Sequence, residues 1–294
     1  MKKLNLLITS TLLCLSAGAQ EYIENAQGDY FGQIEPQDSA IIFAPDIISE
    51  ANRYEYGLAI SPTHDEVFFT CEGVVDSTQI SGLLHIVRKG DKWLKPQIAN
   101  LNKTGLWEQE AFFYPNGEKV FYAVSDSAGT KIWTSSKTKD GWSKGELLNS
   151  PINNASERLF YTSFNNEGDM YYTNVDEFKI YKTELKDGEY KEYAEINLPR
   201  AGHAFIASDE SFIVFDSRQK DSYGKLDIYV AFKDEGGSWG SPINLGPKVN
   251  TEFSETCPAL SPDGEYIFFG RYNDINEKSD IYWISSDIIQ KLKP

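Results

Sequence analysis

A nine-residue pattern of polar and then apolar positions organises the chain. Ser261-Pro262-Asp263-Gly264 supplies residues that favour a tight turn, and Glu265-Tyr266-Ile267-Phe268-Phe269 continues as an aromatic and β-branched run. Proline presets one turn angle, aspartate bonds to its local backbone, and glycine accepts a positive φ. The apolar run favours a half-buried strand. The pattern therefore predicts a turn that leads into a strand.

Degraded copies of this unit recur upstream. Together the units cover residues 61–69, 114–122, 164–172, 207–215 and 261–269, so their starts are 43 to 54 residues apart. A second apolar segment follows each unit, and an aromatic residue follows in the first four: Trp93, Trp142, Tyr190 and Trp239. We interpret these aromatics as core packing between repeats. The period suits four short strands with their turns, which is one blade of a β-propeller.

The repeats predict an all-β, five-bladed β-propeller in a single domain, residues 20–294. Its blade units lie near residues 57–101, 107–152, 157–198, 200–247 and 254–290. The fifth unit holds three strands, and residues 40–44 supply the predicted fourth. Pairing of this N-terminal strand with the last blade closes the ring and removes an open edge. Six blades are the alternative, if residues 22–56 hold further strands.

The fourth and fifth repeats carry a family resemblance. Ser261-Pro262-Asp263-Gly264, followed by Ile267-Phe268-Phe269 and Asp280-Ile281-Tyr282, resembles the TolB-type, WD-like propeller repeat. The stretch from Asp227 through Trp239-Gly240-Ser241-Pro242 to Pro247 is similar to the version common in exported Bacteroidota proteins. The resemblance is weak in the third repeat. It implies a propeller fold and a periplasmic or surface binding role, but no particular chemistry.

The first 19 residues have the pattern of a secretory signal peptide. Met1-Lys2-Lys3 is basic, the run to Leu15 is mostly apolar, and Ala17-Gly18-Ala19 supplies small residues for cleavage after Ala19. A lipoprotein cut before Cys14 is the alternative, although Leu12-Leu13 suits that processing poorly. The apolar run is short for a membrane span of about 20 residues. We therefore expect an exported protein, periplasmic, cell-surface or secreted, without a membrane span.

Net charge limits the classes of partner that the protein can bind, and cysteine content limits its disulfides. The net charge is −16, and removal of residues 1–19 leaves 26 basic residues against 44 acidic ones. So acidic a surface argues against nucleic acid or anionic lipid as the main partner. Cys71 and Cys257 remain, on blades that ring closure makes neighbours. We expect two buried free thiols, with a disulfide as the alternative, and a monomer.

Candidate chemistry gathers ahead of the nine-residue units. The first strand of each blade starts at one rim of the central channel, so residues ahead of the units should converge there. Six positions ahead stand Glu55, Glu108, Arg158, Ala201 and Glu255, and four positions ahead stand Gly57, Glu110, Phe160, His203 and Cys257. The predicted ligand-binding residues are Glu55, Trp107, Glu108, Glu110, Arg158, Arg200, His203, Arg218, Glu255, Arg271 and Tyr272. Aromatic rings that stack and arginines that hold a carboxylate suit a sugar or peptide. The alternative is charged pairs that join neighbouring blades.

The sequence thus predicts an exported binding module for a small glycan, a peptide or an envelope protein. One alternative is a glycan-active enzyme on the same face. Glu108 and Glu255 would be acid and base of a glycoside hydrolase if about 5–10 Å apart, or His203 would abstract a proton beside a uronate, as in a polysaccharide lyase. The other alternative is a structural partner of an envelope complex. Nucleophile-elbow, phosphate-loop and metal motifs are absent from the sequence, so we expect no metal or cofactor.

Overall fold

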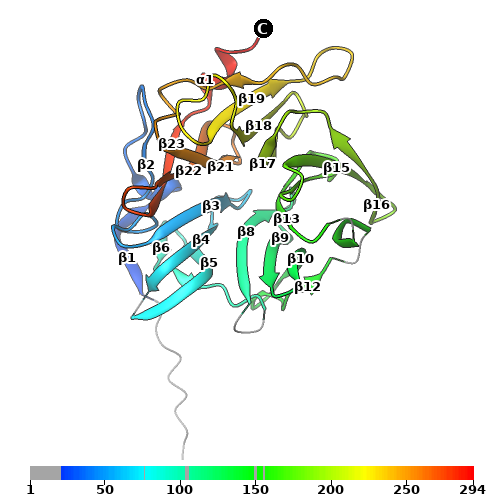
Figure 1. Ribbon diagram of the computed structural model, residues 1–294. Coiled ribbons are helices and arrows are strands. Elements are labelled where there is room, and N and C mark those ends of the chain that lie inside the picture. The colour runs from blue at the N-terminus through cyan, green and yellow to red at the C-terminus, as the bar shows by residue number, and fades with distance from the viewer. Residues whose placement is uncertain (1–20, 76, 103–105, 149–150, 155) are drawn as a thin grey trace, which may run out of the picture.

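The computed structural model describes residues 21–75, 77–102, 106–148, 151–154 and 156–294. The predicted signal peptide, its cleavage site after Ala19, and Cys14 lie outside the described residues. In the described part of the chain, no helix has the length and apolar character needed to cross a membrane. The fold is nearly all β, with sheets arranged around a central axis (Figure 1).

The strands of each sequence repeat pair antiparallel, in order from the axis outward. The first repeat contains β3 (Tyr54–Ile60), β4 (Glu66–Val75) and β5 (Thr78–Lys89), with β6 (Lys92–Leu94) and β7 (Gln97–Ile98) on β5. The second contains β8 (Trp107–Phe113), β9 (Lys119–Asp126) and β10 (Gly129–Thr138), with β11 (Gly141–Trp142) and β12 (Glu146–Leu147) on β10.

The later repeats follow the same order. After the 3-10 helix η2 (Pro151–Asn154), the third contains β13 (Leu159–Phe164), β14 (Met170–Asn174), β15 (Lys179–Lys186) and β16 (Glu189–Ile196). The fourth contains β17 (Ala201–Ile206), β18 (Phe212–Ser217), β19 (Asp227–Phe232) and β20 (Ile243–Asn244). The fifth contains β21 (Ser254–Leu260), β22 (Tyr266–Asn273) and β23 (Lys278–Ser285), and helix α1 (Asp287–Gln290) follows.

The N-terminal segment joins the last repeat. It contains β1 (Tyr22–Gln27), the 3-10 helix η1 (Asp29–Gly32) and β2 (Ile41–Ile42). β2 pairs antiparallel with β23, with Ile41 opposite Trp283, and Figure 1 shows the two strands side by side. The predicted pairing of an N-terminal strand with the last repeat is confirmed. A parallel bridge between Ser279 and Tyr54 also joins β23 to β3, so the first and last repeats are neighbours.

The predicted turns form between the first and second strands. Oγ of Ser261 accepts a hydrogen bond from the N–H of Tyr266 at 2.9 Å, and Ser61 has the equivalent role in the first repeat. His64 replaces the turn glycine there, and its φ is +55° against +76° at Gly264. A polar residue tolerates this left-handed conformation better than a branched one, so His64 is a turn residue.

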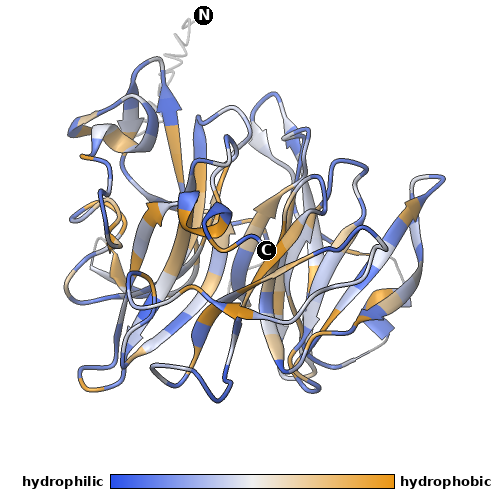
Figure 2. Ribbon diagram, turned by 90° about the horizontal axis from the view of Figure 1, so that it is seen from above, coloured by the Kyte–Doolittle hydropathy of each residue, from blue (hydrophilic) through white to orange (hydrophobic). Residues whose placement is uncertain are grey.

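Apolar side chains lie along the strands, while many of the loops at the two ends are hydrophilic (Figure 2). The recurring aromatics pack in these layers, as the repeats predict. Trp93 is buried, and its ring centre lies 4.5 Å from that of Phe31. Tyr190 is also buried, and its hydroxyl donates a 3.0 Å hydrogen bond to the carbonyl of Gly168. Trp142 and Trp239 are partly buried against neighbouring clusters.

Each innermost strand is interrupted at one equivalent place. The register with the second strand shifts in β3, β8, β13, β17 and β21. The residue at each shift has a positive φ: Gly57 (59°), Glu110 (52°), Tyr161 (54°), His203 (33°) and Cys257 (53°). Such bulges re-aim a side chain out of the alternation of the strand, and a non-glycine residue keeps this conformation only where its surroundings impose it. The bulges thus change the direction of one residue in every repeat.

Candidate functional site

A cavity of about 340 Å³ opens where the innermost strands begin. This size lies within the range of about 300–1,000 Å³ that is typical of small-molecule sites. Every repeat contributes to its wall, which contains Tyr54, Tyr56, Glu72, Trp107, Gln109, Glu110, Arg158, Phe160, Thr173, Val175, Phe178, Gly202, His203, Asp216, Leu226, Thr256 and Cys257. The cavity lies at the channel mouth where the sequence places its candidate residues.

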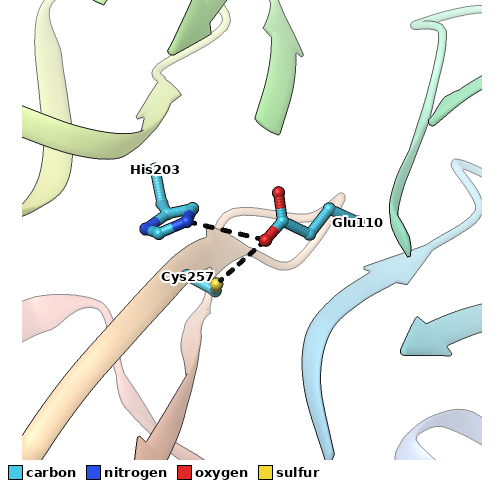
Figure 3. Close-up of side chains that lie close together, drawn as sticks. All are labelled: Glu110, His203 and Cys257. Atoms are coloured by element: carbon cyan, nitrogen blue, oxygen red, sulfur yellow. Dashed lines mark hydrogen bonds and ion pairs between the residues drawn. The ribbon is translucent and has the colours of Figure 1, made fainter. Parts of the chain in front are cut away.

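Three bulge residues meet in the wall of this cavity (Figure 3). Nε2 of His203 lies 3.5 Å from Oε1 of Glu110, and Sγ of Cys257 lies 3.8 Å from the same oxygen. One donor atom from each residue lies within 4.8 Å of the other two. Because these residues come from three different repeats, only the closed ring of sheets brings them together.

Asp216 of β18 positions His203. Its Oδ2 lies 2.6 Å from Nδ1 of the imidazole and also accepts a 3.2 Å hydrogen bond from the N–H of Cys257. Burial alone would lower the pKa of His203, but the charges of Asp216 and Glu110 outweigh burial and raise it to about 9. The two carboxylates therefore favour an imidazolium between them.

Glu110 and Cys257 are almost completely buried, each with 3% of its surface exposed. Burial raises the pKa of Glu110, and burial together with the Glu110 charge raises the pKa of the Cys257 thiol well above its ordinary value. Among the described residues, Oε2 of Glu110 has no hydrogen-bond partner. Cys257 and the buried Cys71 are both free thiols, as expected, and form no disulfide. A protonated thiol is a weak nucleophile, so this geometry does not favour covalent catalysis by Cys257.

Aromatic side chains occupy another part of the wall. The ring centre of Tyr54 lies 5.5 Å from that of Tyr56 and 5.3 Å from that of Tyr272. Tyr272 packs against Tyr54 but does not itself line the cavity. Trp107 and Phe178 remain 37% and 41% exposed. Exposed aromatic faces beside buried polar groups suit a ligand with one apolar face.

The predicted arginines separate in the structure. Arg158 lines the cavity, with Nη1 3.5 Å from a carboxylate oxygen of Asp176. Arg200 lies outside the lining, with its guanidinium 5.9 Å from the ring centre of Phe178. Arg218 is exposed and also outside the lining.

Glu255 and Arg271 form a buried pair away from the lining. Nε of Arg271 donates to Oε1 of Glu255 at 2.7 Å, and its Nη2 donates to the carbonyl of Val249 at 2.7 Å. The carboxylate of Glu255 also accepts the N–H of Thr251 at 3.1 Å. The pair joins β21 to β22 and to the loop that enters β21, so it has a structural role within the fifth repeat and does not join neighbouring blades.

Glu108 and Glu55 occupy equivalent places. Oε1 of Glu108 accepts the N–H of Asn102 at 2.5 Å, and Oε1 of Glu55 accepts Nε of Arg53 at 2.7 Å. Because neighbours in a strand point to opposite faces, Trp107 lines the cavity while Glu108 turns to its own loop. The structure thus brings Trp107, Glu110, Arg158 and His203 together and does not bring in the three glutamates at the strand entries.

Several lining residues were not among the predicted site residues. The sequence predicted Cys257 only as a buried free thiol, like Cys71, although Cys257 holds the same repeat position as Glu110 and His203. That shared repeat position is the sequence signal that would have assigned Cys257 to the site. Asp216 lies near the end of the second strand of its repeat, and Phe178 carried no repeat signal at all.

A second cavity, of about 480 Å³, lies at the other ends of the innermost strands. Phe112, Phe164 and Phe205 contribute to its wall, together with residues of the turns between first and second strands. Asp209 and Asp263 contribute carboxylates to this wall, whereas the bulge residues Glu110, His203 and Cys257 all lie at the first cavity.

Comparison with known proteins identifies the class of fold. The sequence matches no protein-family model and no curated protein. Among solved structures, a TolB candidate from Agrobacterium tumefaciens is 14% identical, with a TM-score of 0.53 over 80% of this chain and 78% of that one. The chain has a TolB-like β-propeller fold. A thermostable family-43 glycoside hydrolase is similarly related, at 13% identity and a TM-score of 0.54 over 80% and 90% of the two chains. A glycoside hydrolase candidate from Parabacteroides distasonis is 9% identical, with a TM-score of 0.50 over 89% and 97%. At such identities the likeness concerns the fold alone.

Proposed function

We propose that the protein is an exported β-propeller binding module whose cavity at the channel mouth takes a small, neutral glycan. The observation that carries this proposal is one cavity with wall residues from every repeat, in which aromatic faces stand beside carboxylate and amide groups. Tyr54, Trp107 and Phe178 offer faces for the C–H side of a sugar ring. The carboxylate of Glu72 offers acceptors for its hydroxyl groups.

The charges in the wall favour a neutral sugar over a uronate. Glu72, Glu110 and Asp216 line the cavity together with His203 and Arg158. An anionic ligand would meet three carboxylates, and His203 is already engaged by two of them. Arg158 is the one predicted arginine in the wall, so a grip on a uronate carboxylate by several arginines is not supported.

A glycan-active enzyme is the second candidate. It is favoured by the 2.6 Å contact between His203 and Asp216 beside Glu110, because an imidazole held by a carboxylate can move a proton. Glu108 and Glu255 already accept backbone hydrogen bonds, so a hydrolase on this face would use Glu110 and Asp216, and a lyase would use His203. Two structural relatives are described as glycoside hydrolases, but at 13% and 9% identity they support only the fold.

We also propose five blades, one for each sequence repeat, with β2 completing the last. The antiparallel pairing in each repeat and the contact between Ile41 and Trp283 support this count. The signal-peptide pattern of residues 1–19 supports export to the periplasm, the cell surface or the medium. A scaffold role in an envelope complex is the remaining alternative.

The test is thermal unfolding and calorimetry with neutral oligosaccharides, oligouronates and short peptides, since a ligand of the native state raises the melting temperature. Neutral sugars should raise it. Trp107→Ala should weaken their binding by about tenfold or more, which corresponds to about 1.4 kcal/mol. The matched control Tyr223→Ala removes another exposed aromatic, 53% exposed and outside the lining, and should leave binding unchanged. Binding of oligouronates or peptides alone, or no binding at all, would overturn the proposal; sugar cleavage or elimination would favour the enzyme.

A further inference from the structure

We propose that Glu110, His203 and Cys257 form a binding site for a divalent transition metal of the zinc class (Figure 3). This goes beyond the proposed function, and no metal motif in the sequence points to it. The ligands lie far apart in the chain, and they come together through one repeat position rather than through a short motif.

The distances fit a tetrahedral metal. With metal–ligand bonds of about 2.0–2.3 Å, a tetrahedron separates a nitrogen from an oxygen by about 3.3 Å and a sulfur from an oxygen by about 3.6 Å. The corresponding separations are 3.5 Å between His203 and Glu110 and 3.8 Å between Cys257 and Glu110. The ring nitrogen of His203 and Sγ of Cys257 lie within 4.8 Å of each other, so one ion can contact all three donors once the side chains close around it.

The three donor atoms, and the carboxylate that orients His203, also suit a zinc site. Imidazole nitrogen, thiolate sulfur and carboxylate oxygen are the three ligand types of protein zinc. A metal-binding histidine usually gives its other ring nitrogen to a carboxylate, which fixes its orientation. Asp216 has that contact with Nδ1 of His203, at 2.6 Å, and leaves Nε2 directed at Glu110. The metal would replace the proton on Nε2 of His203 and the proton on Sγ of Cys257, and both protons would pass to the solvent.

The protein maintains costly features at this point. Glu110, His203 and Cys257 all hold left-handed backbone conformations, which are unfavourable for residues other than glycine. Glu110 is buried with its Oε2 unpartnered among the described residues, although a buried carboxylate oxygen without a partner is destabilising. The left-handed backbone recurs at Tyr161 and so belongs to the repeat, whereas the buried carboxylate is particular to this point, and a cation bound at Oε1 would neutralise it.

Three protein ligands leave one tetrahedral position. Zinc sites with this count keep the fourth position for water or a bound molecule. All three ligands line the cavity, so the fourth position would face a molecule held there. The metal would supply a direct contact to a ligand oxygen in the cavity.

The test uses the full-length protein, reduced, with Zn²⁺ alone and then Co²⁺ as a spectroscopic probe. Calorimetry should detect one Zn²⁺ per chain, and Co²⁺ should give a thiolate-to-cobalt charge-transfer band. The control Cys14→Ser/Cys71→Ala leaves Cys257 as the single cysteine and should retain that band, whereas Cys257→Ser should lose it. Asp216→Asn should weaken Zn²⁺ binding by about 10–100-fold, and Glu110→Gln or His203→Ala by more than that.

Each outcome bears on the proposal. Absence of Zn²⁺ binding, or a cobalt band that persists in Cys257→Ser, would overturn it. If Cys257→Ser fails to fold, the band of Cys14→Ser/Cys71→Ala decides, since Cys257 is then the sole thiol. Sugar binding measured with a chelator present separates the two proposals, because a glycan can bind the aromatic wall whether or not the metal site exists.

Discussion

Gly57 leaves the space that Glu110 occupies. A Cβ at Gly57 would lie 3.2 Å from Cγ of Glu110 and 3.3 Å from Oγ1 of Thr70, which accepts the N–H of Glu110 at 2.9 Å. The bulge of the first repeat thus lacks a side chain at the place where the bulge of the second repeat puts one.

We expect Gly57→Ala to destabilise the protein by two effects. The left-handed φ of +59° costs an alanine about 1–2 kcal/mol, and the close contact adds about 1 kcal/mol or more. Gly90→Ala is the matched control, because Gly90 has φ +63° but nothing within 4 Å of an added Cβ. Urea unfolding of both variants measures the difference; equal losses would show that the contact with Glu110 has no cost.

Removal of Glu255 should damage stability rather than ligand binding. Its carboxylate is fully buried and paired with Arg271, and breaking such a pair costs about 3–5 kcal/mol because the partner charge stays buried. Chemical unfolding should show this loss for Glu255→Ala and almost none for the exposed Glu265→Ala. A Glu255→Ala variant of unchanged stability that no longer binds sugar would instead assign Glu255 to the site.

Acid should weaken the contact between the first two repeats at Glu66. Burial would raise the pKa of Glu66, but hydrogen bonds from His85 (2.8 Å) and Lys137 (2.6 Å) outweigh it and lower this pKa to about 2. A folded-state pKa below the ordinary value of 4.5 stabilises the native protein above pH 4.5, and this stabilisation disappears as the pH falls toward 2. Unfolding as a function of pH should therefore show Glu66→Gln less stable than the natural protein near neutrality and equal to it near pH 2. A difference that stays constant with pH would contradict this.

The N-terminal segment should be required for stability. Phe43, next to β2, is fully buried, with its ring 4.8 Å from Phe268 and 5.2 Å from Trp283. Phe43→Ala should lower the free energy of unfolding by about 3–5 kcal/mol, whereas Ile275→Ala, 84% exposed, should change it by less than about 0.5 kcal/mol. Similar losses in both variants would mean that the segment packs loosely.

The repeated part of the fold follows from the sequence. Turn residues followed by an aromatic and β-branched strand recur about every 43 to 54 residues, so the strand order and the pairing of residues 40–44 with the last repeat could be predicted before the structure. The third repeat was less certain for a physical reason. Its turn, Asn165-Asn166-Glu167-Gly168, departs from the pattern, and its bulge falls at Tyr161, one residue after Phe160, which stands four positions ahead of the unit.

The site was only partly predictable. Position four ahead of each unit does gather Glu110, His203 and Cys257, because a bulge there re-aims the side chain. Position six ahead points to the other face of the strand at Glu55, Glu108 and Glu255, whereas Arg158, at the same count, lines the cavity. Whether Glu108 faces the channel or the N–H of Asn102 depends on where the loop runs, and a spacing along the chain does not contain that information.

The pairing of Ile41 with Trp283 also governs when the molecule can be completed. A ribosome makes residue 41 long before residue 283, so the strand that finishes the last sheet must wait, unpaired, for nearly the whole chain. Contacts between distant parts of a sequence slow folding. The nascent protein therefore stays open until its C-terminal repeat has been made.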